Sequence, residues 1–234
     1  MQLFYAEHIN EDSKHFVFDK TESRHIIRVL RKGSGDPVHI TDGKGREYQC
    51  VITEPNDKRC QVEITQVVEH KKQWNYQLHI AIAPTKMNDR IEWFLEKATE
   101  IGIDQITPII CDHSERKVIK MDRMEKIVVS AMKQSLKFHL PVLNPICSYK
   151  EFVSSHIEEE KFIAHCEDRN QNLLKNAIQS DNILILIGPE GDFSSKEIDL
   201  AAKYGFTQIS LGESRLRTET AALVACNTVS ILKQ

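Results

Sequence analysis

Two loops in this sequence carry residues suited to holding a ligand. The first follows residues 183–187, an apolar and mostly β-branched run that is typical of a central parallel strand buried on both faces. Gly188-Pro189 ends that run, because Pro has no N–H for the ladder and Gly tolerates positive φ. Open α/β sheets bind ligands at such strand ends, so we expect a ligand site at this loop.

The second loop repeats the arrangement. A strand over residues 209–211 ends at Gly212, a polar loop follows, and a helix begins between Thr218 and Thr220. After the first loop, Ser194 and Glu197 are spaced as a capping box and predict another helix start. Two such loops would wall one pocket from both sides.

Neither loop is a phosphate loop of a known nucleotide-binding type. The fingerprints Gly-x-x-x-x-Gly-Lys-Ser/Thr and Gly-x-Gly-x-x-Gly are both absent. The carboxylates of Glu190 and Asp192 would repel phosphates and favour a ligand with positive charge or hydrogen-bond donors. From local chemistry alone, Gly188-Pro189 and Gly212 are equally compatible with simple turns.

Together the two loops resemble signatures of the small-subunit (16S) ribosomal RNA uridine-N3 methyltransferases, members of the SPOUT superfamily that use S-adenosylmethionine. The matching segments are 188–194 (Gly-Pro-Glu-Gly-x-Phe-Ser) and 211–221 (Leu-Gly-x-x-x-Leu-Arg-Thr-Glu-Thr-Ala), and the resemblance extends across nearly the whole chain. There are two departures. Asp192 stands where a second Gly is expected and adds a charge beside the cofactor loop, and Ser214-Arg215 replace an expected Arg-Ile.

The resemblance implies that backbone groups of the two loops hold S-adenosylmethionine, since glycines allow close approach. Cys166 and Glu167, just past a predicted strand, are implied as a third wall. The implied cofactor-binding residues are Ile187, Gly188, Glu190, Gly191, Leu211, Gly212, Leu216, Arg217, Thr218 and Cys166.

Methylation of uridine N3 is an in-line displacement that needs neither a metal nor a covalent enzyme intermediate. Because N3 is only weakly acidic, a base or an oxyanion stabiliser would help. Glu219 is the candidate base, and Arg217 is a candidate for stabilising negative charge on a uracil oxygen. Glu219 is equally well explained as a first-turn carboxylate favoured by the helix dipole, and Arg217 as a contact to RNA phosphate.

RNA contacts are expected first in a predicted helix over residues 22–30, where Arg24, Arg28 and Arg31 gather on one side. A solvated helix face is the simpler explanation; a phosphate-binding patch is the alternative. The resemblance favours the patch, because the family carries an N-terminal PUA-like barrel that is thought to hold RNA. It also implies that His25 contacts RNA or braces its loop. Contacts to RNA or to the partner subunit are implied at Lys86, Arg90, Arg116, Gln134 and Ser135, although Arg90 is also compatible with a solvated helix position.

Composition sets further bounds. The chain has 234 residues, 41% hydrophobic and 28% charged, which allows one large domain or two modest ones. Its formal net charge of −3 means that any RNA-binding surface must be local. No apolar run approaches the ~18 residues of a membrane helix, and no signal peptide is recognisable. The six scattered cysteines argue against a zinc site and fit a cytoplasmic protein with reduced thiols.

The order of predicted elements indicates two domains. Residues 1–70 contain short alternating runs at 15–18, 38–41, 48–52 and 60–64, as a small barrel requires. A polar break over residues 69–76 precedes alternating strands (78–83, 106–110, 162–165) and helices (89–101, 124–136, 173–178), which predict a largely parallel sheet. The fold class is therefore α/β: a PUA-like β-barrel over residues 1–70, followed by a SPOUT domain over residues 77–234.

The resemblance also implies a C-terminal trefoil knot and a homodimer. Ordinary topology rules do not predict the knot. The last predicted helix, residues 220–232, is apolar on all sides in its first half, so we expect it to be buried between its own sheet and a partner subunit.

Two other functions remain open on the sequence. A non-catalytic RNA-binding factor for ribosome assembly would share the fold, but its cofactor loops should be degraded, and here they are intact. A Rossmann-type nucleotide-binding enzyme is disfavoured by the missing phosphate fingerprint.

Overall fold

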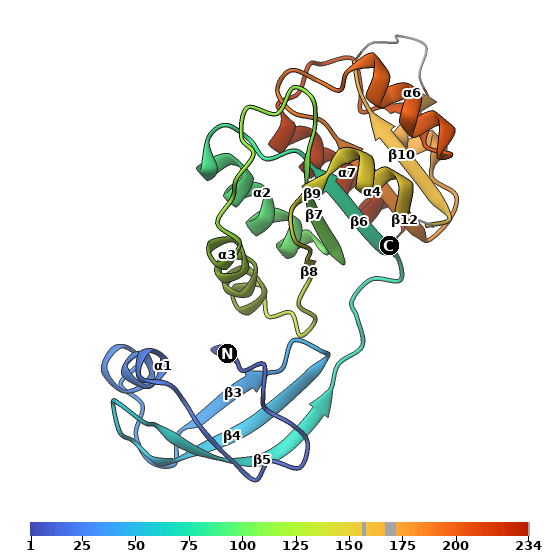
Figure 1. The fold of residues 1–234 in the computed structure, drawn as a ribbon. Coiled ribbons are helices and arrows are strands. Elements are labelled where there is room, and N and C mark those ends of the chain that lie inside the picture. Colours follow the sequence, from blue (N-terminus) through green and yellow to red (C-terminus); the bar gives the residue numbers. More distant parts are fainter. Residues whose placement is uncertain (156–157, 167–171, 234) are drawn as a thin grey trace. The chain divides into compact units, whose positions relative to one another are not determined.

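The computed structural model describes residues 1–155, 158–166 and 172–233, which form two compact units (Figure 1). The first unit comprises Met1–Lys72 and Met132–Leu140, and the second comprises Gln73–Ala131 and Pro141–Gln234. The predicted polar break coincides with the point, after Lys72, where the chain passes from the first unit to the second.

The first unit is built on a five-stranded sheet with the spatial order β1-β3-β4-β5-β2. The β1 strand pairs parallel with β3, and all other neighbours pair antiparallel. Its four predicted strands are confirmed, and β1 was not predicted. The strands are β1 (Leu3–Tyr5), β2 (His15–Val17), β3 (Pro37–Thr41), β4 (Arg46–Glu54) and β5 (Gln61–Glu69).

The predicted helix over residues 22–30 is present but changes type along its length. It begins as α1 (Lys20–Arg24), where the Asp19 side chain accepts the Glu22 N–H at 2.8 Å. It continues as the π-helix η1 (His25–Val29), closed by a bond from the Leu30 N–H to the His25 carbonyl. Ile26 packs into the core of the first unit, while Arg24 and Arg28 remain exposed.

A segment far along the chain, residues 132–140, packs into the first unit rather than the second. The Gly45 N–H donates to the Phe138 carbonyl and the Leu140 N–H donates to the Gly43 carbonyl, each at 2.8 Å. The ring of His70 stacks on Phe138 with centroids 3.8 Å apart. These contacts explain why residues 132–140 depart from the contiguous second domain that the sequence predicts.

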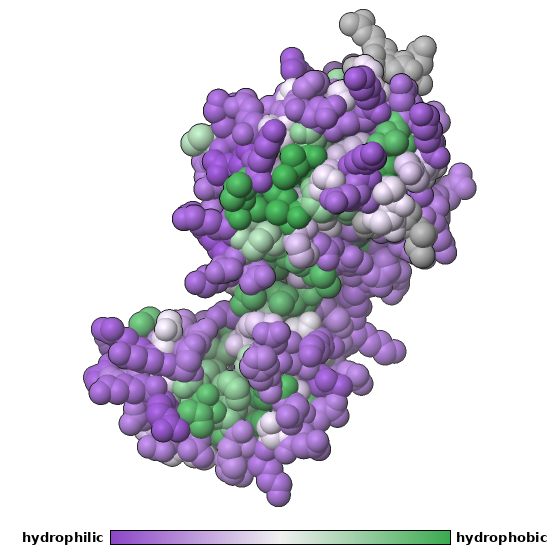
Figure 2. Space-filling view, in the orientation of Figure 1, coloured by the Kyte–Doolittle hydropathy of each residue, from purple (hydrophilic) through white to green (hydrophobic). Residues whose placement is uncertain are grey.

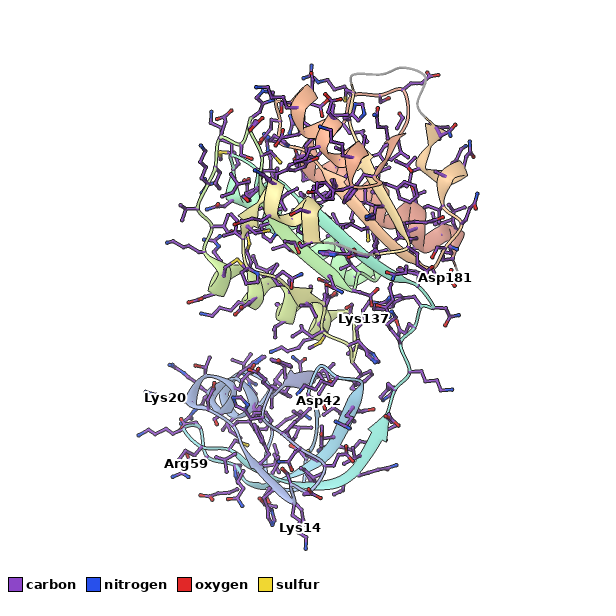
Figure 3. The ribbon with its side chains drawn as sticks, turned by 45° about the vertical axis from the view of Figure 1, so that its right-hand side comes forward. Lys14, Lys20, Asp42, Arg59, Lys137 and Asp181 are labelled. Atoms are coloured by element: carbon purple, nitrogen blue, oxygen red, sulfur yellow. The ribbon has the colours of Figure 1, made fainter. Side chains whose placement is uncertain are left out.

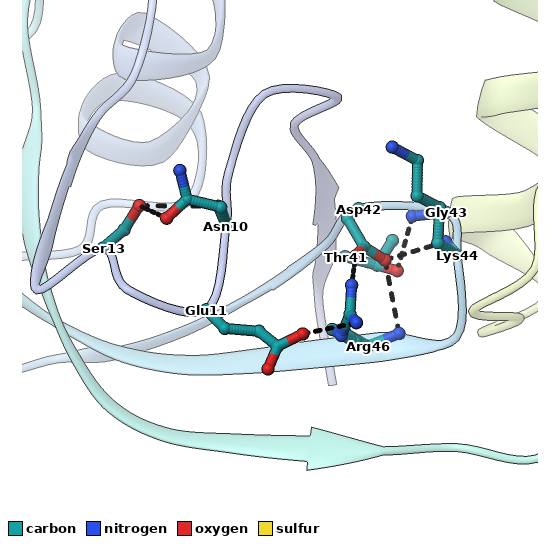
Figure 4. Close-up of polar contacts among 8 residues, drawn as sticks. All are labelled: Asn10, Glu11, Ser13, Thr41, Asp42, Gly43, Lys44 and Arg46. Carbon is teal, nitrogen blue, oxygen red and sulfur yellow. Dashed lines mark hydrogen bonds and ion pairs between the residues drawn. The ribbon is translucent and has the colours of Figure 1, made fainter.

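Residues 138–140 contact the turn over residues 42–45, and Asp42 fixes that turn. The buried carboxylate of Asp42 accepts the N–H groups of Lys44 (2.7 Å) and Arg46 (3.3 Å) (Figure 4). Gly45 has φ +99°, and a Cβ there would lie 2.8 Å from Nε2 of His139. Glycine is therefore favoured at this position both by the positive φ and by the close approach of His139.

Gly45→Ala is expected to lower the free energy of unfolding by about 1–3 kcal/mol, since Ala must adopt an unfavourable φ and displace His139. Urea denaturation followed by circular dichroism measures this. Gly33→Ala is the matched control, because a Cβ at Gly33 meets nothing within 4 Å and no positive φ opposes it. Equal stability of the two variants would refute the packing role of Gly45.

The second unit contains an eight-stranded sheet with the path β11-β13-β10-β12-β6-β7-β8, in which β9 also pairs with β7. Every pairing in it is parallel. Its strands are β6 (Gln77–Ile82), β7 (Gln105–Ile110), β8 (Val142–Leu143), β9 (Cys147–Ser148), β10 (Glu160–Ala164), β11 (Asn172–Leu173), β12 (Asn182–Ile187) and β13 (Thr207–Ser210). The predicted central strand is confirmed, since β12 lies between β10 and β6 and residues 183–187 are buried.

Helices cover both faces of this sheet (Figure 1). Leu184 and Leu186 join a core cluster with residues of α4 and α6, and the alternating side chains of β12 point to the opposite face, where α7 packs on β6, β12 and α2. The helices are α2 (Asn88–Ile101), α3 (Met121–Gln134), α4 (Tyr149–Ser155), α5 (Leu174–Ala177), α6 (Ser195–Lys203) and α7 (Thr218–Leu232).

Several local predictions for this unit differ from the structure. Asp89 and Glu92 do not cap α2, whose N-cap residue is Met87, because Glu92 instead pairs with Arg123 at 2.6 Å. The helix expected over residues 173–178 shrinks to α5, because Leu173 pairs with Ser210 in the sheet. The trefoil knot stays a prediction.

Candidate functional site

The loops singled out in the sequence emerge from one edge of the second unit's sheet. All strands there are parallel, so their carboxyl ends share that edge. The loop over residues 188–194 follows β12 and the loop over residues 211–217 follows β13. Between them in the sheet order lies β10, followed by His165 and Cys166. The two loops thus flank the third wall expected at Cys166, whereas Glu167 lies outside the described residues.

The loop over residues 188–194, called here the cofactor loop, is a tight turn closed by a bond from the Asp192 N–H to the Pro189 carbonyl at 2.9 Å. A Cβ on Gly188 would lie 3.1 Å from the buried Phe193 ring, so close packing requires glycine there. Glu190 accepts the Lys86 N–H at 3.0 Å, which joins the cofactor loop to the loop after β6.

Asp192, one of the departures from the family pattern, stands in the left-handed conformation with φ 61°. That backbone explains why glycine is expected there. Its carboxylate accepts the N–H groups of Cys166 and Phe193, each at 2.8 Å. Asp192 therefore links the cofactor loop to the end of β10, a contact that glycine cannot make.

The start of α6 is held as predicted. Ser194 and Glu197 form the capping box, in which Glu197 accepts the Ser194 N–H at 2.8 Å. Glu197 is buried and its second oxygen accepts the Asp112 N–H at 2.9 Å. Asp112 in turn accepts the Ser194 hydroxyl at 2.6 Å, so the segment after β7 is tied to the cofactor loop.

The loop over residues 211–217 is less tightly packed at its glycine than the cofactor loop is at Gly188. Gly212 has φ 131°, and a Cβ there would meet nothing within 4 Å. The Ser210 hydroxyl accepts the Gly212 N–H at 3.2 Å and fixes the turn. Arg217 is exposed at the N-cap of α7 and makes no capping bond through its side chain, while Thr218 is buried. Leu211 and Leu216 are half-buried beside it.

Glu219 lies in the first turn of α7 and is only 6% exposed. One carboxylate oxygen lies 3.8 Å from Nε of Arg90 on α2, and the other accepts no hydrogen bond from any residue that the structure describes. A buried carboxylate oxygen without a donor is costly, so it is suited to a partner brought by a substrate.

The expected RNA residues divide between the two units. Lys86 pairs with Glu115 at 2.8 Å, and Arg116 donates through Nη2 to the Lys86 carbonyl at 2.6 Å. Arg116 thereby braces the loop after β6. Together with Arg90 these belong to the second unit, whereas the first unit contains Arg24, His25, Arg28, Arg31, Gln134 and Ser135.

The basic face of the first unit is larger than the sequence indicates. Arg28 donates to Asp57 through Nε at 2.9 Å and through Nη2 at 2.7 Å, and this bond lowers the pKa of Asp57. Exposed Lys58 and Arg59 therefore lie in the β4–β5 turn beside η1, and Figure 3 shows Lys20 and Arg59 on one side of this unit. The pair Lys58-Arg59 is visible in the sequence, but its proximity to Arg28 is a long-range contact.

Two groups at the strand edge have shifted pKa values. Burial raises the pKa of the Cys166 thiol, and Asp192 adds to the effect, so Cys166 stays protonated near neutral pH. Hydrogen bonds to the carbonyls of Asp192 and Gly191 raise the pKa of His113. His113 was not identified from the sequence, since nothing in its local pattern points to the cofactor loop.

No group of three or more His, Cys, Asp or Glu side chains suited to a metal ion occurs in residues 1–155, 158–166 and 172–233. Across the same described residues, no helix has the length and apolar character needed to span a membrane.

The chain matches known proteins along most of its length. The family described as RNA methyltransferase domain matches residues 72–230, and the RNA methyltransferase PUA domain matches residues 18–65. Ribosomal RNA small subunit methyltransferase E of Rickettsia conorii is 25% identical over 99% of this chain and 95% of its own length.

Solved structures agree with this fold. A probable rRNA methyltransferase from Porphyromonas gingivalis is 42% identical, with a TM-score of 0.93 over 100% of this chain and 98% of that one. A ribosomal RNA small subunit methyltransferase E from Neisseria gonorrhoeae, bound to S-adenosylmethionine, is 28% identical, with a TM-score of 0.84 over 97% and 95% of the two chains. With its PUA-like unit and its parallel sheet of SPOUT type, this chain belongs to the RNA methyltransferase domain family.

Proposed function

We propose that this protein is an S-adenosylmethionine-dependent methyltransferase that methylates N3 of a uridine in small-subunit (16S) ribosomal RNA. The observation that carries the proposal is the pair of loops after β12 and β13, which flank the end of β10 and keep the motifs of the family intact. The names of its relatives, which are small-subunit ribosomal RNA methyltransferases, support the substrate class.

The residues at the strand edge fit S-adenosylmethionine. Open space beside Gly212 leaves its backbone accessible, and the carboxylates of Glu190 and Asp192 suit a cationic ligand. The residues proposed to hold the cofactor are Ile187, Gly188, Glu190, Gly191, Leu211, Gly212, Leu216, Arg217, Thr218 and Cys166. When bound, S-adenosylmethionine supplies a methyl group on a positively charged sulfur.

The chain's own contribution to catalysis is proposed to come from α7. The free oxygen of Glu219 would accept the N3 proton of uridine, leaving the nitrogen lone pair available for attack. Arg90 lies 3.8 Å from the other oxygen and helps to orient the carboxylate. Arg217 is exposed and lies two residues before Glu219. Its guanidinium would stabilise the negative charge that develops on the uracil oxygens.

RNA binding is proposed to rest mainly on the first unit. Arg24, Arg28 and Arg31 are exposed there, and Lys58 and Arg59 extend the basic face. Such a face binds the phosphates of RNA without recognising the nucleotide sequence. The contacts proposed at His25, Lys86, Arg90, Arg116, Gln134 and Ser135 would position the target loop, with Arg116 acting through the loop that it braces.

A homodimer is also proposed. In α7, Ala222, Ala225 and Cys226 are fully buried against the same unit, whereas Leu223 and Val224 on the other side stay half-exposed. Trp93 on α2 is 42% exposed, and Figure 2 shows a patch of apolar surface on the visible face of the second unit. A partner subunit would cover such surface.

Sedimentation equilibrium at micromolar concentration should therefore give about twice the chain mass of 26.9 kDa. Leu223→Glu should shift the protein to the monomer, because a buried unpaired charge at an interface costs several kcal/mol. Val17→Glu, an exposed apolar position of the first unit, is the control and should stay dimeric. A monomeric wild type would refute the homodimer.

The six cysteines are all free thiols, which supports a reducing compartment, the cytoplasm, as the place of action. The second candidate function, a non-catalytic RNA-binding assembly factor, is opposed by the intact cofactor loops.

Titration calorimetry tests the proposed function directly. The wild-type protein should bind S-adenosylmethionine and should bind neither ATP nor NAD, since the phosphate fingerprints are absent. Binding of RNA without binding of S-adenosylmethionine would instead favour the assembly factor.

A further inference from the structure

The segment that follows β7 reaches both neighbouring loops of the site. The imidazole of His113 donates through Nδ1–H to the carbonyls of Gly191 and Asp192, each at 3.0 Å. Three residues later, Arg116 donates to the carbonyls of Thr85 and Lys86 at 3.2 and 2.6 Å. Residues 111–116 thus join the cofactor loop to the loop after β6.

The fit between His113 and the cofactor loop is close. A Cβ on Gly191 would lie 3.1 Å from Cβ of His113, so a glycine at 191 lets the imidazole reach the carbonyls. The left-handed backbone of Asp192 turns two successive carbonyls toward one donor. His113 itself is exposed, so its ring is not needed to fill the core.

We propose that His113 is a positioning residue, which holds the carbonyls of Gly191 and Asp192 so that the cofactor loop keeps the conformation that receives S-adenosylmethionine. The inference rests on the proposed function. The other ties of this loop run from Asp192 to Cys166, from Glu190 to Lys86 and, at its end, from Ser194 to Asp112. His113 connects the segment after β7 to the middle of the turn, which would move more freely without it before the cofactor binds.

The proposal makes a prediction about pH. The groups that face His113 are the two carbonyls and the carboxylates of Asp112 and Glu197, all of which raise its pKa. Because the folded pKa is raised, the extra stabilisation is present at low pH and is lost as pH rises through that pKa. The free energy of unfolding of the wild type should therefore fall with rising pH relative to a variant without an imidazole.

Three substitutions distinguish the effect of the hydrogen-bond donor from the effect of the imidazole ring. In His113→Asn the amide nitrogen takes the place of Nδ1, in His113→Gln it takes the place of Nε2, and in His113→Leu there is no donor. Calorimetry should show S-adenosylmethionine binding about 3- to 10-fold weaker in the Leu and Gln variants, as for one lost hydrogen bond, and near-normal binding in the Asn variant. His8→Leu, at an exposed histidine of the first unit, is the matched control.

A second readout separates positioning from general stability. The KM for S-adenosylmethionine should rise in His113→Leu while the KM for RNA does not, whereas a general loss of stability would affect both. Unchanged affinity in His113→Leu, or equal losses in the Asn and Leu variants, would overturn the role of His113 and leave the proposed function standing. A wild type that binds no S-adenosylmethionine would overturn both.

Discussion

Glu219→Gln is expected to slow single-turnover methyl transfer by about 10² or more, while S-adenosylmethionine and RNA still bind. The amide keeps the shape of the side chain but cannot take the N3 proton. Because the carboxylate is 6% exposed and one of its oxygens has no donor among the described residues, the substitution removes basicity at a buried position suited to the incoming substrate. Rapid-quench measurement of methyl transfer at saturating cofactor gives the rate.

Glu125→Gln, an exposed position on α3, is the matched control and should react at the wild-type rate. Near-normal turnover in Glu219→Gln would reduce Glu219 to a first-turn carboxylate that pairs with Arg90. The rate enhancement would then come mainly from positioning the uracil against the methyl group of the cofactor.

Replacing Arg24, Arg28 and Arg31 together with Ala should weaken RNA binding strongly and flatten its dependence on salt. Each phosphate contact that is lost should reduce the log–log salt slope by roughly 0.7 to 0.9. Affinity for S-adenosylmethionine should not change, because the three arginines lie in the first unit and the cofactor loop lies in the second. Filter binding at a series of salt concentrations measures the slope.

A charge-matched control is available in the second unit. Lys150, Lys175 and Lys203 are exposed, and their replacement with Ala removes the same three charges. If both triple variants had the same salt slope, the arginines would act only through net charge, and residues 24–31 would carry an ordinary solvated face. An unchanged slope in the arginine variant alone would have the same consequence for residues 24–31.

The backbone of the site could be predicted because its signals are local. Five successive apolar residues identify β12, Gly188 ends it, and Ser194 with Glu197 caps the next helix, each within a few residues. The same reasoning fails at Asp89 and Glu92, where a distant partner, Arg123, takes the capping carboxylate. Local propensity is overridden there by a contact 31 residues away.

What could not be predicted depends on tertiary contacts. Nothing near His113 or Lys58 in the sequence indicates that the first lies on the cofactor loop and the second beside Arg28. Likewise, long-range contacts such as the docking of Phe138 against Gly45 and His70 assign residues 132–140 to the first unit. The family resemblance, in contrast, implied cofactor and substrate classes that composition and periodicity do not contain.

The central claim is tested most directly by incubating the purified protein with S-adenosylmethionine and unmodified small ribosomal subunits, with the naked 16S RNA in parallel. Mass spectrometry of the digested RNA should then find one added methyl group, on N3 of a uridine, in at least one of the two substrates. Methylation at another atom or another base, or no methylation of either substrate by a protein that binds the cofactor, would contradict the account.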